Sequence, residues 1–293
     1  MLGVSVVVFV VTRLLIDPTA RLVPIGSSQE QYDAAQAAHG FDRSIPAQFV
    51  DFMGDLVRLD FGRSVWLGGD ARTIVVERMP ATLVLVGASI GLAVLIAVPT
   101  VVIAVLKPGS WLDRIATTGA LFGIAVPSFW LGALLILLFS VNLGWLPTSG
   151  GGDLQHLVLP AIALALPSAG RLAQVGRAAV LEQMQERYIT AVLAKGMSRR
   201  RAVVFHALRN AAAPILSILT WEVSRAISSG TVVVETVFGW PGVGQLAVSA
   251  LQRGDVFVIQ AVVFLVAVTV VVVNALGDAG LQRVDPRTRA AAR

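Results

Sequence analysis

Long stretches without a charged residue constrain this chain more than any other feature. Residues 79–106, 115–152 and 256–277 contain no Asp, Glu, Lys or Arg. A helix needs about 20 predominantly apolar residues to cross a lipid bilayer, so each stretch predicts a transmembrane helix. Of all residues, 56% are apolar and 14% are charged, whereas a soluble domain carries about 25% charged residues. The sequence therefore predicts an all-α integral membrane protein and excludes a soluble globular domain.

Three further stretches predict less regular spans. Residues 154–170 are uncharged but contain two prolines, and residues 210–235 are apolar apart from Glu222 and Arg225 before they end in a glutamate. Residues 2–16 are apolar apart from Arg13 but short for a bilayer, so we expect the native chain to begin earlier. Six transmembrane helices follow, the first of them shortened.

The basic residues predict the orientation and the domain organisation. Lys and Arg gather in the cytoplasmic loops of membrane proteins. Here they crowd the loop 178–210 and the tail 278–293, whereas residues 142–156 hold none. We therefore predict that both termini and the loop are cytoplasmic. Residues 17–80 then form an extracytoplasmic segment between the first two spans, and residues 81–277 form the transmembrane core.

The external segment carries helical signals of its own. Ser27–Gly40 combines capping serines with a terminating glycine, as a short helix does. Ala47–Leu59 places its apolar side chains at helical spacing. We expect two amphipathic helices here, and packing on the outer face of the membrane is their simplest role.

Residues 186–214, ERYITAVLAKGMSRRRAVVFHALRNAAAP, form the most informative loop. The pattern predicts a helix, a break at Gly196 and a second helix, because glycine adopts a left-handed turn without steric cost. A short helix that projects from the bilayer can transmit the motion of a soluble partner to the spans. A solvated basic loop on the cytoplasmic side explains the same composition, and both readings stay open at this point.

Most of this loop, YITAVLAKGMSRRRAVVFHALRNAAAP, resembles the EAA-type loop of bacterial ABC importer permeases, in the form found in their dipeptide/oligopeptide branch. Residues 230–246, GTVVVETVFGWPGVGQL, are similar to the second signature of that branch. Shorter pieces agree in order along the chain: DRSIPAQF, FGRS, RMPATL, VPSFWLG, LGWLPTSG and VDPR. The resemblance covers nearly the whole chain.

The resemblance implies a permease subunit of an ATP-driven importer, located in the bacterial inner (cytoplasmic) membrane, that moves dipeptides or oligopeptides into the cytoplasm. It implies four kinds of partner: a second homologous permease that completes a heterodimer, two cytoplasmic ATP-binding subunits, an extracytoplasmic substrate-binding protein and the peptide itself. ATP and Mg belong to the ATPase subunits. We expect no cofactor, metal or nucleic acid on this chain, and membrane lipid around it.

The same resemblance assigns a coupling helix that contacts the ATPase subunits. The residues that it implies are Tyr188, Thr190, Ala191, Ala194, Lys195, Gly196, Ser198, Arg199 and Arg200. One departure concerns the EAA triplet of the wider family, where this chain has Thr190, Ala191 and Val192.

Charged and polar side chains within the spans predict the translocation path. Glu222 and Arg225 are three residues apart and share one helix face. Charges inside a membrane face a cavity or each other. These two residues therefore line the path, together with Ser128 and Ser229, or they only neutralise each other.

The turn after residue 237 predicts an external gate. Phe238, Trp240 and Pro241 belong to it, and the alternative is a turn that merely reverses the chain.

The sequence does not predict an enzyme. It has no cysteine and neither a phosphate-binding loop that ends in Gly-Lys-Ser/Thr nor an HExxH helix. Three alternatives stay open: a secondary transporter driven by an ion gradient, an intramembrane enzyme or assembly protein, and an importer of the same branch for nickel chelates or glutathione.

Overall fold

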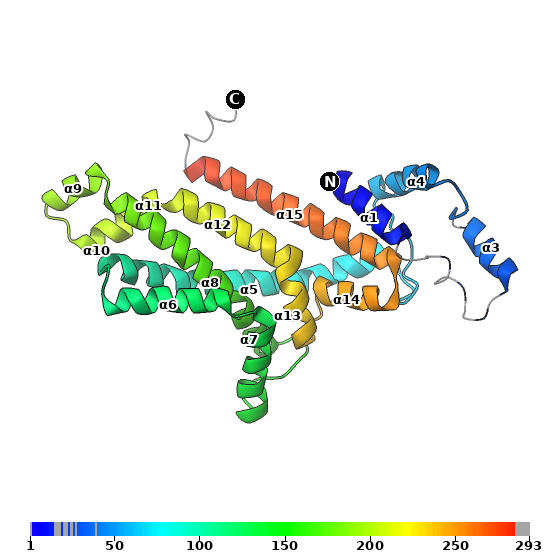
Figure 1. The fold of residues 1–293 in the computed structure, drawn as a ribbon, viewed down its shortest axis with the longest axis horizontal. Coiled ribbons are helices and arrows are strands. Elements are labelled where there is room, and N and C mark those ends of the chain that lie inside the picture. The colour runs from blue at the N-terminus through cyan, green and yellow to red at the C-terminus, as the bar shows by residue number, and fades with distance from the viewer. Residues whose placement is uncertain are drawn as a thin grey trace. The chain divides into compact units, whose positions relative to one another are not determined.

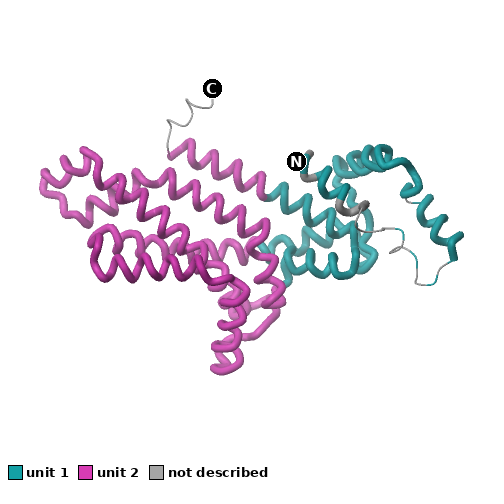
Figure 2. The backbone as a smooth tube through the Cα atoms, viewed as in Figure 1, with its two compact units in different colours: residues 1–82, 241–269 teal, residues 83–240, 270–293 magenta. Residues whose placement is uncertain are grey.

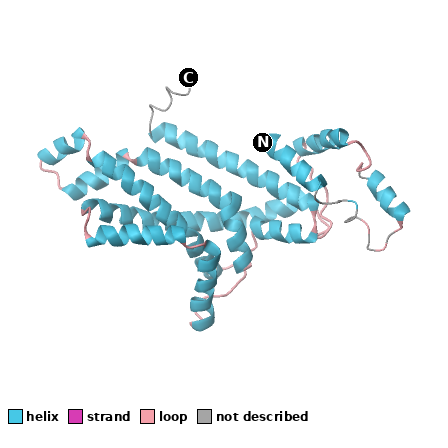
Figure 3. Cartoon of the chain, viewed as in Figure 1, coloured by secondary structure: helices cyan, strands magenta, loops and turns pink. Residues whose placement is uncertain are grey.

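The computed structural model describes residues 2–14, 19, 23, 26, 28–38 and 40–284. Within these ranges every regular element is a helix (Figures 1 and 3), apart from one isolated β-bridge between Arg63 and Asp70. The chain divides into two compact units (Figure 2). The first unit comprises residues 1–82 and 241–269, and the second unit comprises residues 83–240 and 270–293.

The first unit contains the external segment and the helix that begins at the end of the second signature. Its helices are α1 (Leu2–Leu14), α3 (Gln29–Ala38), α4 (Ile45–Val57), the start of α5 (Ala71–Leu106), α14 (Val243–Arg253) and the first part of α15 (Val256–Val284). Helices α3 and α4 lie where the sequence predicts the two external helices. Helix α5 begins at Ala71, ten residues before the predicted start of the core at 81.

Apolar side chains of four helices, together with Phe61 between α4 and α5, form the core of the first unit. Its buried residues are Leu56, Phe61, Ala71, Val75, Val243, Leu246, Ala250, Val258, Ala261 and Val262. Asp255, buried before α15, ties the segment after α4 to this core. Its Oδ2 accepts hydrogen bonds from Ser64 Oγ at 2.6 Å and from the Trp66 amide at 3.1 Å. This carboxylate, just before α15, therefore fixes the path of residues 61–64 (FGRS), which follow α4.

The second unit contains most of the long apolar helices. Besides the rest of α5 and α15, its elements are α6 (Trp111–Ala125), α7 (Ser128–Leu135), η1 (Ile136–Asn142), α8 (Leu154–Met184), α9 (Arg187–Ala194), α10 (Arg199–Arg201), η2 (Ala202–Ala207), α11 (Leu208–Asn210), α12 (Ala212–Arg225), η3 (Ala226–Gly230) and α13 (Thr231–Phe238). The η elements are π-helical segments that continue α-helices.

Three described helices, α5, α8 and α15, are long and apolar enough to cross a membrane, and two bent pairs raise this number to five. One pair joins α6 to α7 and η1 at 99°, and the other joins Arg199–Asn210 to Ala212–Phe238 at 61°. The first bend falls at Val126, which is extended because proline follows it. Helix α1 has 13 described residues, and the count of six spans stays a prediction.

Helix α8 stays continuous over 31 residues although it contains Pro160 and Pro167. Neighbouring helices compensate for proline inside a membrane, and α8 packs closely against α6. A side chain at Gly170 would collide with the carbonyl oxygen of Ala120, and one at Gly123 would lie 2.9 Å from that of Leu166. Glycines therefore allow these two backbones to approach.

An ion pair joins the same two helices nearer the predicted cytoplasmic end. Arg177 on α8 donates two hydrogen bonds of 2.9 Å to the carboxylate of Asp113 on α6. Ser110 caps α6 by accepting the Asp113 amide. Bidentate arginine–carboxylate pairs fix geometry as well as energy, so this pair sets the register of α6 on α8.

Candidate functional site

The loop between α8 and α12 folds as a short helix, a glycine break and a second helix, as the sequence predicts. Helix α9 ends at Ala194, and Gly196 follows with φ +87°. This left-handed conformation favours glycine. Ser198 then accepts the Arg201 amide as the N-cap of the next helix.

Helix α9 has one buried face and one exposed face. Ile189 is 1% exposed and packs with Leu193 and Tyr188 into the core of the second unit. Tyr188 also donates its hydroxyl to Gln183 Oε1 at 2.9 Å. The remaining residues of the predicted coupling set are exposed: Thr190, Ala191, Ala194, Lys195, Gly196, Ser198, Arg199 and Arg200. One face of α9 is therefore packed against the core, and its opposite face exposes small side chains.

A cluster of charged groups lies between α8 and α12, around the carboxylate of Glu222. Glu222 is 0% exposed. Its Oε2 accepts hydrogen bonds from Ser168 Oγ at 2.8 Å and from Nη2 of both Arg171 and Arg225 at 3.0 Å. Nε of Arg171 contacts the other carboxylate oxygen. We call Ser168, Arg171, Glu222 and Arg225 the arginine cluster.

The arginine cluster is buried at its carboxylate and partly open at its cations. The side chains of Arg171 and Arg225 are 23% and 28% exposed. Their guanidinium carbons lie 5.8 and 5.9 Å from the ring centre of Trp221, which is half exposed. Two guanidinium groups share one carboxylate, so the cluster carries a net positive charge.

A π-helical segment follows Arg225 directly. It covers Ala226–Gly230, and such segments are frequent at functional sites because they redirect side chains and free backbone groups. The hydroxyls of Ser228 and Ser229 both donate to the Arg225 carbonyl at 3.3 Å. Of the four predicted path residues, the structure brings Glu222, Arg225 and Ser229 together on one stretch of α12 and η3. Ser128 begins α7, half-buried.

Sequence reasoning did not find Arg171 and Ser168 as members of this cluster. They are 51 and 54 residues from Glu222. Arg171 follows the uncharged stretch 154–170 and precedes the predicted loop 178–210, and the structure places it within α8. One feature of the sequence did indicate that Arg171 lies within a helix. The uncharged stretch 154–170 is short for a span, so the helix had to continue through Arg171.

The residues of the predicted external gate are packed in this structure. Phe238, the last residue of α13, is buried, and so is Trp240. A side chain at Gly132 on α7 would lie 2.9 Å from the Phe238 ring, and the Gly150 amide donates to the Phe238 carbonyl at 2.9 Å. Pro241 comes just before α14.

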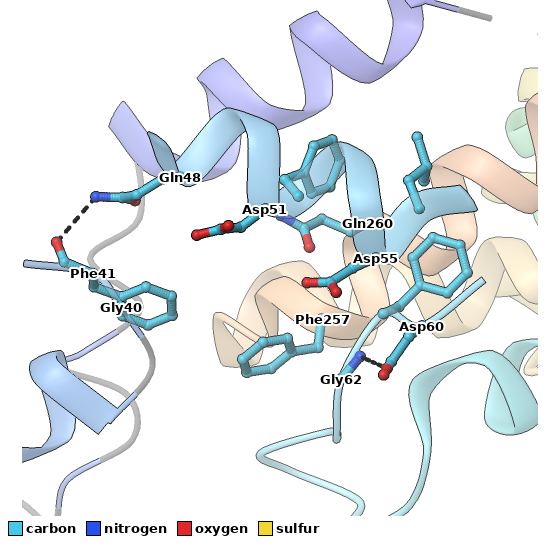
Figure 4. Close-up of a pocket in the computed structure, with 12 residues that line it drawn as sticks. Gly40, Phe41, Gln48, Asp51, Asp55, Asp60, Gly62, Phe257 and Gln260 are labelled. Carbon is cyan, nitrogen blue, oxygen red and sulfur yellow. Dashed lines mark hydrogen bonds between the residues drawn. The ribbon is translucent and has the colours of Figure 1, made fainter. Parts of the chain in front are cut away.

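A pocket of about 220 Å³, lined by both acidic and apolar side chains, lies in the first unit (Figure 4). Asp51 and Asp55, one turn apart on α4, line it together with Asp60 and with Phe257 and Gln260 of α15. Burial raises the pKa of Asp55 above its ordinary value, and the carboxylate of Asp60 raises it further. This pocket is acidic, whereas the arginine cluster is basic.

Catalytic and metal chemistry find little support in the described residues. No group of three or more His, Asp or Glu side chains there is arranged to hold a metal ion. The sequence Gly87-Ala88-Ser89-Ile90-Gly91 matches the spacing of a hydrolase nucleophile turn, but it lies within α5, where the Ser89 hydroxyl donates to the Val86 carbonyl. A nucleophile of that class needs a strand-to-helix turn, so this serine is structural.

Comparison with known proteins decides the family. Residues 89–290 match the model of the binding-protein-dependent transport system inner membrane component. This chain belongs to that family. The match covers more than half of the chain, including α9 and the arginine cluster. The chain is therefore a membrane component of an ABC importer, a transport subunit rather than an enzyme. Its family works with ATP-binding subunits and a substrate-binding protein, in the inner membrane.

Relatives match the permease over nearly its whole length. The oligopeptide transport system permease protein AppB of Bacillus subtilis is 34% identical, over 98% of this chain and 94% of that protein. The di/tripeptide permease DppB of Pseudomonas aeruginosa and the glutathione permease GsiC of Escherichia coli are each 33% identical, with the same coverage.

Solved structures agree on the fold. An inward-facing MetNI methionine ABC transporter matches with a TM-score of 0.61 and 21% identity, over 72% of this chain and 96% of that chain. The all-helical permease fold expected from the sequence is confirmed.

Proposed function

We propose that this permease moves short peptides from a substrate-binding protein into the cytoplasm. The observation that carries the proposal is the full-length similarity to permeases named for oligopeptides, di/tripeptides and glutathione. All three named cargoes contain peptide bonds, and glutathione is itself a small peptide. A glutathione importer is the second candidate, because one of the relatives carries that name.

We further propose that α9 is the coupling helix. Its buried Ile189 anchors it to the core, so a force on the exposed face moves the spans. The exposed Thr190, Ala191 and Ala194 are small and lie on neighbouring positions of one face. Small side chains let a partner approach closely, and Lys195 to Arg200 surround this face with positive charge. In this proposal the loop and both termini are cytoplasmic.

Alternating access then follows from differential affinity for two states. ATP binding draws the two ATPase subunits together, and the coupling helix of each permease carries this movement into the spans. The path forms between this chain and a second, homologous permease. Glu222, Arg225, Ser128 and Ser229 line it, and Phe238, Trp240 and Pro241 close its outer end until the contact of Phe238 with α7 opens.

Purification of the tagged chain from its native host in mild detergent tests the assembly. We expect a second permease and ATP-binding subunits in the mass spectrum of the purified complex. A chain that purifies alone, and that takes up substrate without ATP, would contradict the proposal and favour ion coupling.

One substitution tests the coupling helix within that complex. Ala191→Arg places a long cationic side chain on the exposed face and should release the ATPase subunits while the second permease stays bound. Ala38→Arg, on the exposed end of α3, is the matched control and should retain all subunits. ATPase subunits that stay bound and active in Ala191→Arg would place the contact elsewhere.

A further inference from the structure

The arginine cluster holds one more cation than its buried carboxylate can neutralise. Among the described residues, the ion pairs of Arg171 and Arg225 go only to Glu222. Within the described part of the chain, the hydrogen bonds of the two guanidinium groups go to Glu222 or to Ser168. Each arginine thus keeps N–H groups that have no acceptor within the cluster, since a guanidinium has five donors.

The position of the cluster makes this excess charge expensive unless an anion meets it. Arg171 is 17 residues from the start of α8 and 13 from its end, or about 26 and 20 Å along the helix. Helix α8 is longer than a bilayer is thick, and residue 171 lies seven residues, or about 10 Å along the helix, before the predicted cytoplasmic loop at 178. Arg171 therefore lies within the predicted span, on its cytoplasmic side. An ionised side chain at such depth faces a water-filled cavity or an opposite charge.

The open side of the cluster has the chemistry of a carboxylate site. The side chains of Arg171 and Arg225 are each about a quarter exposed, next to the half-exposed Trp221. A planar guanidinium binds carboxylates through paired hydrogen bonds, and the buried Glu222 and Ser168 hold both planes in place. The indole provides an apolar wall beside them.

We propose that Arg171 and Arg225 bind the C-terminal carboxylate of the peptide during its passage. This inference rests on the proposed peptide transport. It adds which part of the peptide the permease recognises. Glu222 is then a positioning residue, which orients the two arginines and leaves one charge for the substrate. Cargo without a free carboxylate should cross poorly.

The test compares ATP-dependent uptake of trialanine and of trialanine amide into proteoliposomes that contain the whole complex. We measure the ratio of the two initial rates in the wild type and in Arg171→Gln. The binding protein is the same in both, so its own preference cancels when the two ratios are compared. We expect the acid-to-amide ratio to fall about tenfold, as the loss of a charge-assisted hydrogen bond predicts.

Three further variants separate recognition from stability. Arg171→Lys keeps the charge and should retain most of the preference for the acid. Arg225→Gln should lower the ratio as Arg171→Gln does, and it replaces that variant if the latter does not assemble. Arg177→Gln removes an arginine from the same helix, outside the cluster, and should leave the ratio at its wild-type value even if both rates decrease.

The outcomes distinguish this inference from the proposed function. Equal loss of acid and amide uptake in both glutamine variants would overturn the inference. Loss of the second permease from both variants would also overturn it, because the charge would then be structural. A wild type that moves both peptides equally well would overturn it while leaving peptide transport intact. A complex that moves neither peptide, with ATP present, would overturn the proposed function and this inference with it.

Discussion

Replacing Glu222 by Gln removes the only negative charge of the arginine cluster and nearly preserves the size of the side chain. The variant leaves two guanidinium groups within hydrogen-bond distance of the same neutral amide. Removing one partner of a buried ion pair destabilises a protein by about 3–5 kcal/mol. Since both arginines are about a quarter exposed, water replaces part of the lost interaction. We therefore expect a loss near the lower limit, about 3 kcal/mol.

Thermal unfolding of the purified complex, followed by tryptophan fluorescence, measures this loss. The Tm should fall by roughly 5–10 °C. Glu182→Gln, at an exposed position on the same α8 that supplies Arg171, is the matched control and should change the Tm by little. Arg171→Gln and Arg225→Gln should each lower the Tm less than Glu222→Gln, because each leaves a neutral pair.

The order of these effects is decisive. If Glu222→Gln is as stable as the wild type, or more stable than either arginine variant, the carboxylate does not hold the two cations together. The electrostatic account of the cluster would then be wrong.

Other parts of the chain give three further predictions. Gly170→Ala should destabilise the complex by about 1–3 kcal/mol in thermal unfolding, because its methyl group collides with α6, whereas Gly119→Ala meets no neighbour and should be neutral or stabilising. The raised pKa of Asp55 means that its protonated form stabilises the fold, an effect present at low pH and lost as the pH rises through that pKa. Asp55→Asn should therefore slow hydrogen exchange in α4 at pH 7 but not at pH 3. Asp255→Ala should lower the Tm more than Ser64→Ala, because it leaves the buried Ser64 hydroxyl and the Trp66 amide without their acceptor.

The apolar pattern predicts the long helices because a bilayer requires one simple property of a span. Residues 79–106 and 256–277 fall within α5 and α15. The pattern does not fix where a helix ends, since polar residues continue a helix beyond the membrane. Helix α15 thus runs to Val284, past the predicted start of the tail at 278, and the remaining residues of that tail lie outside the described part of the chain.

The arginine cluster shows the limit of sequence reasoning more sharply. Glu222 and Arg225 are three residues apart, and helical geometry alone predicts that they meet. Arg171 reaches them only through the packing of α8 on α12, and no local pattern encodes such a contact.

ATP-driven uptake of trialanine into proteoliposomes that contain this permease, its partner permease, the ATPase subunits and the binding protein tests the central claim most directly. The account predicts accumulation that requires ATP and the binding protein and that persists when ionophores abolish ion gradients. Uptake that continues without ATP and stops on addition of an ionophore would contradict it.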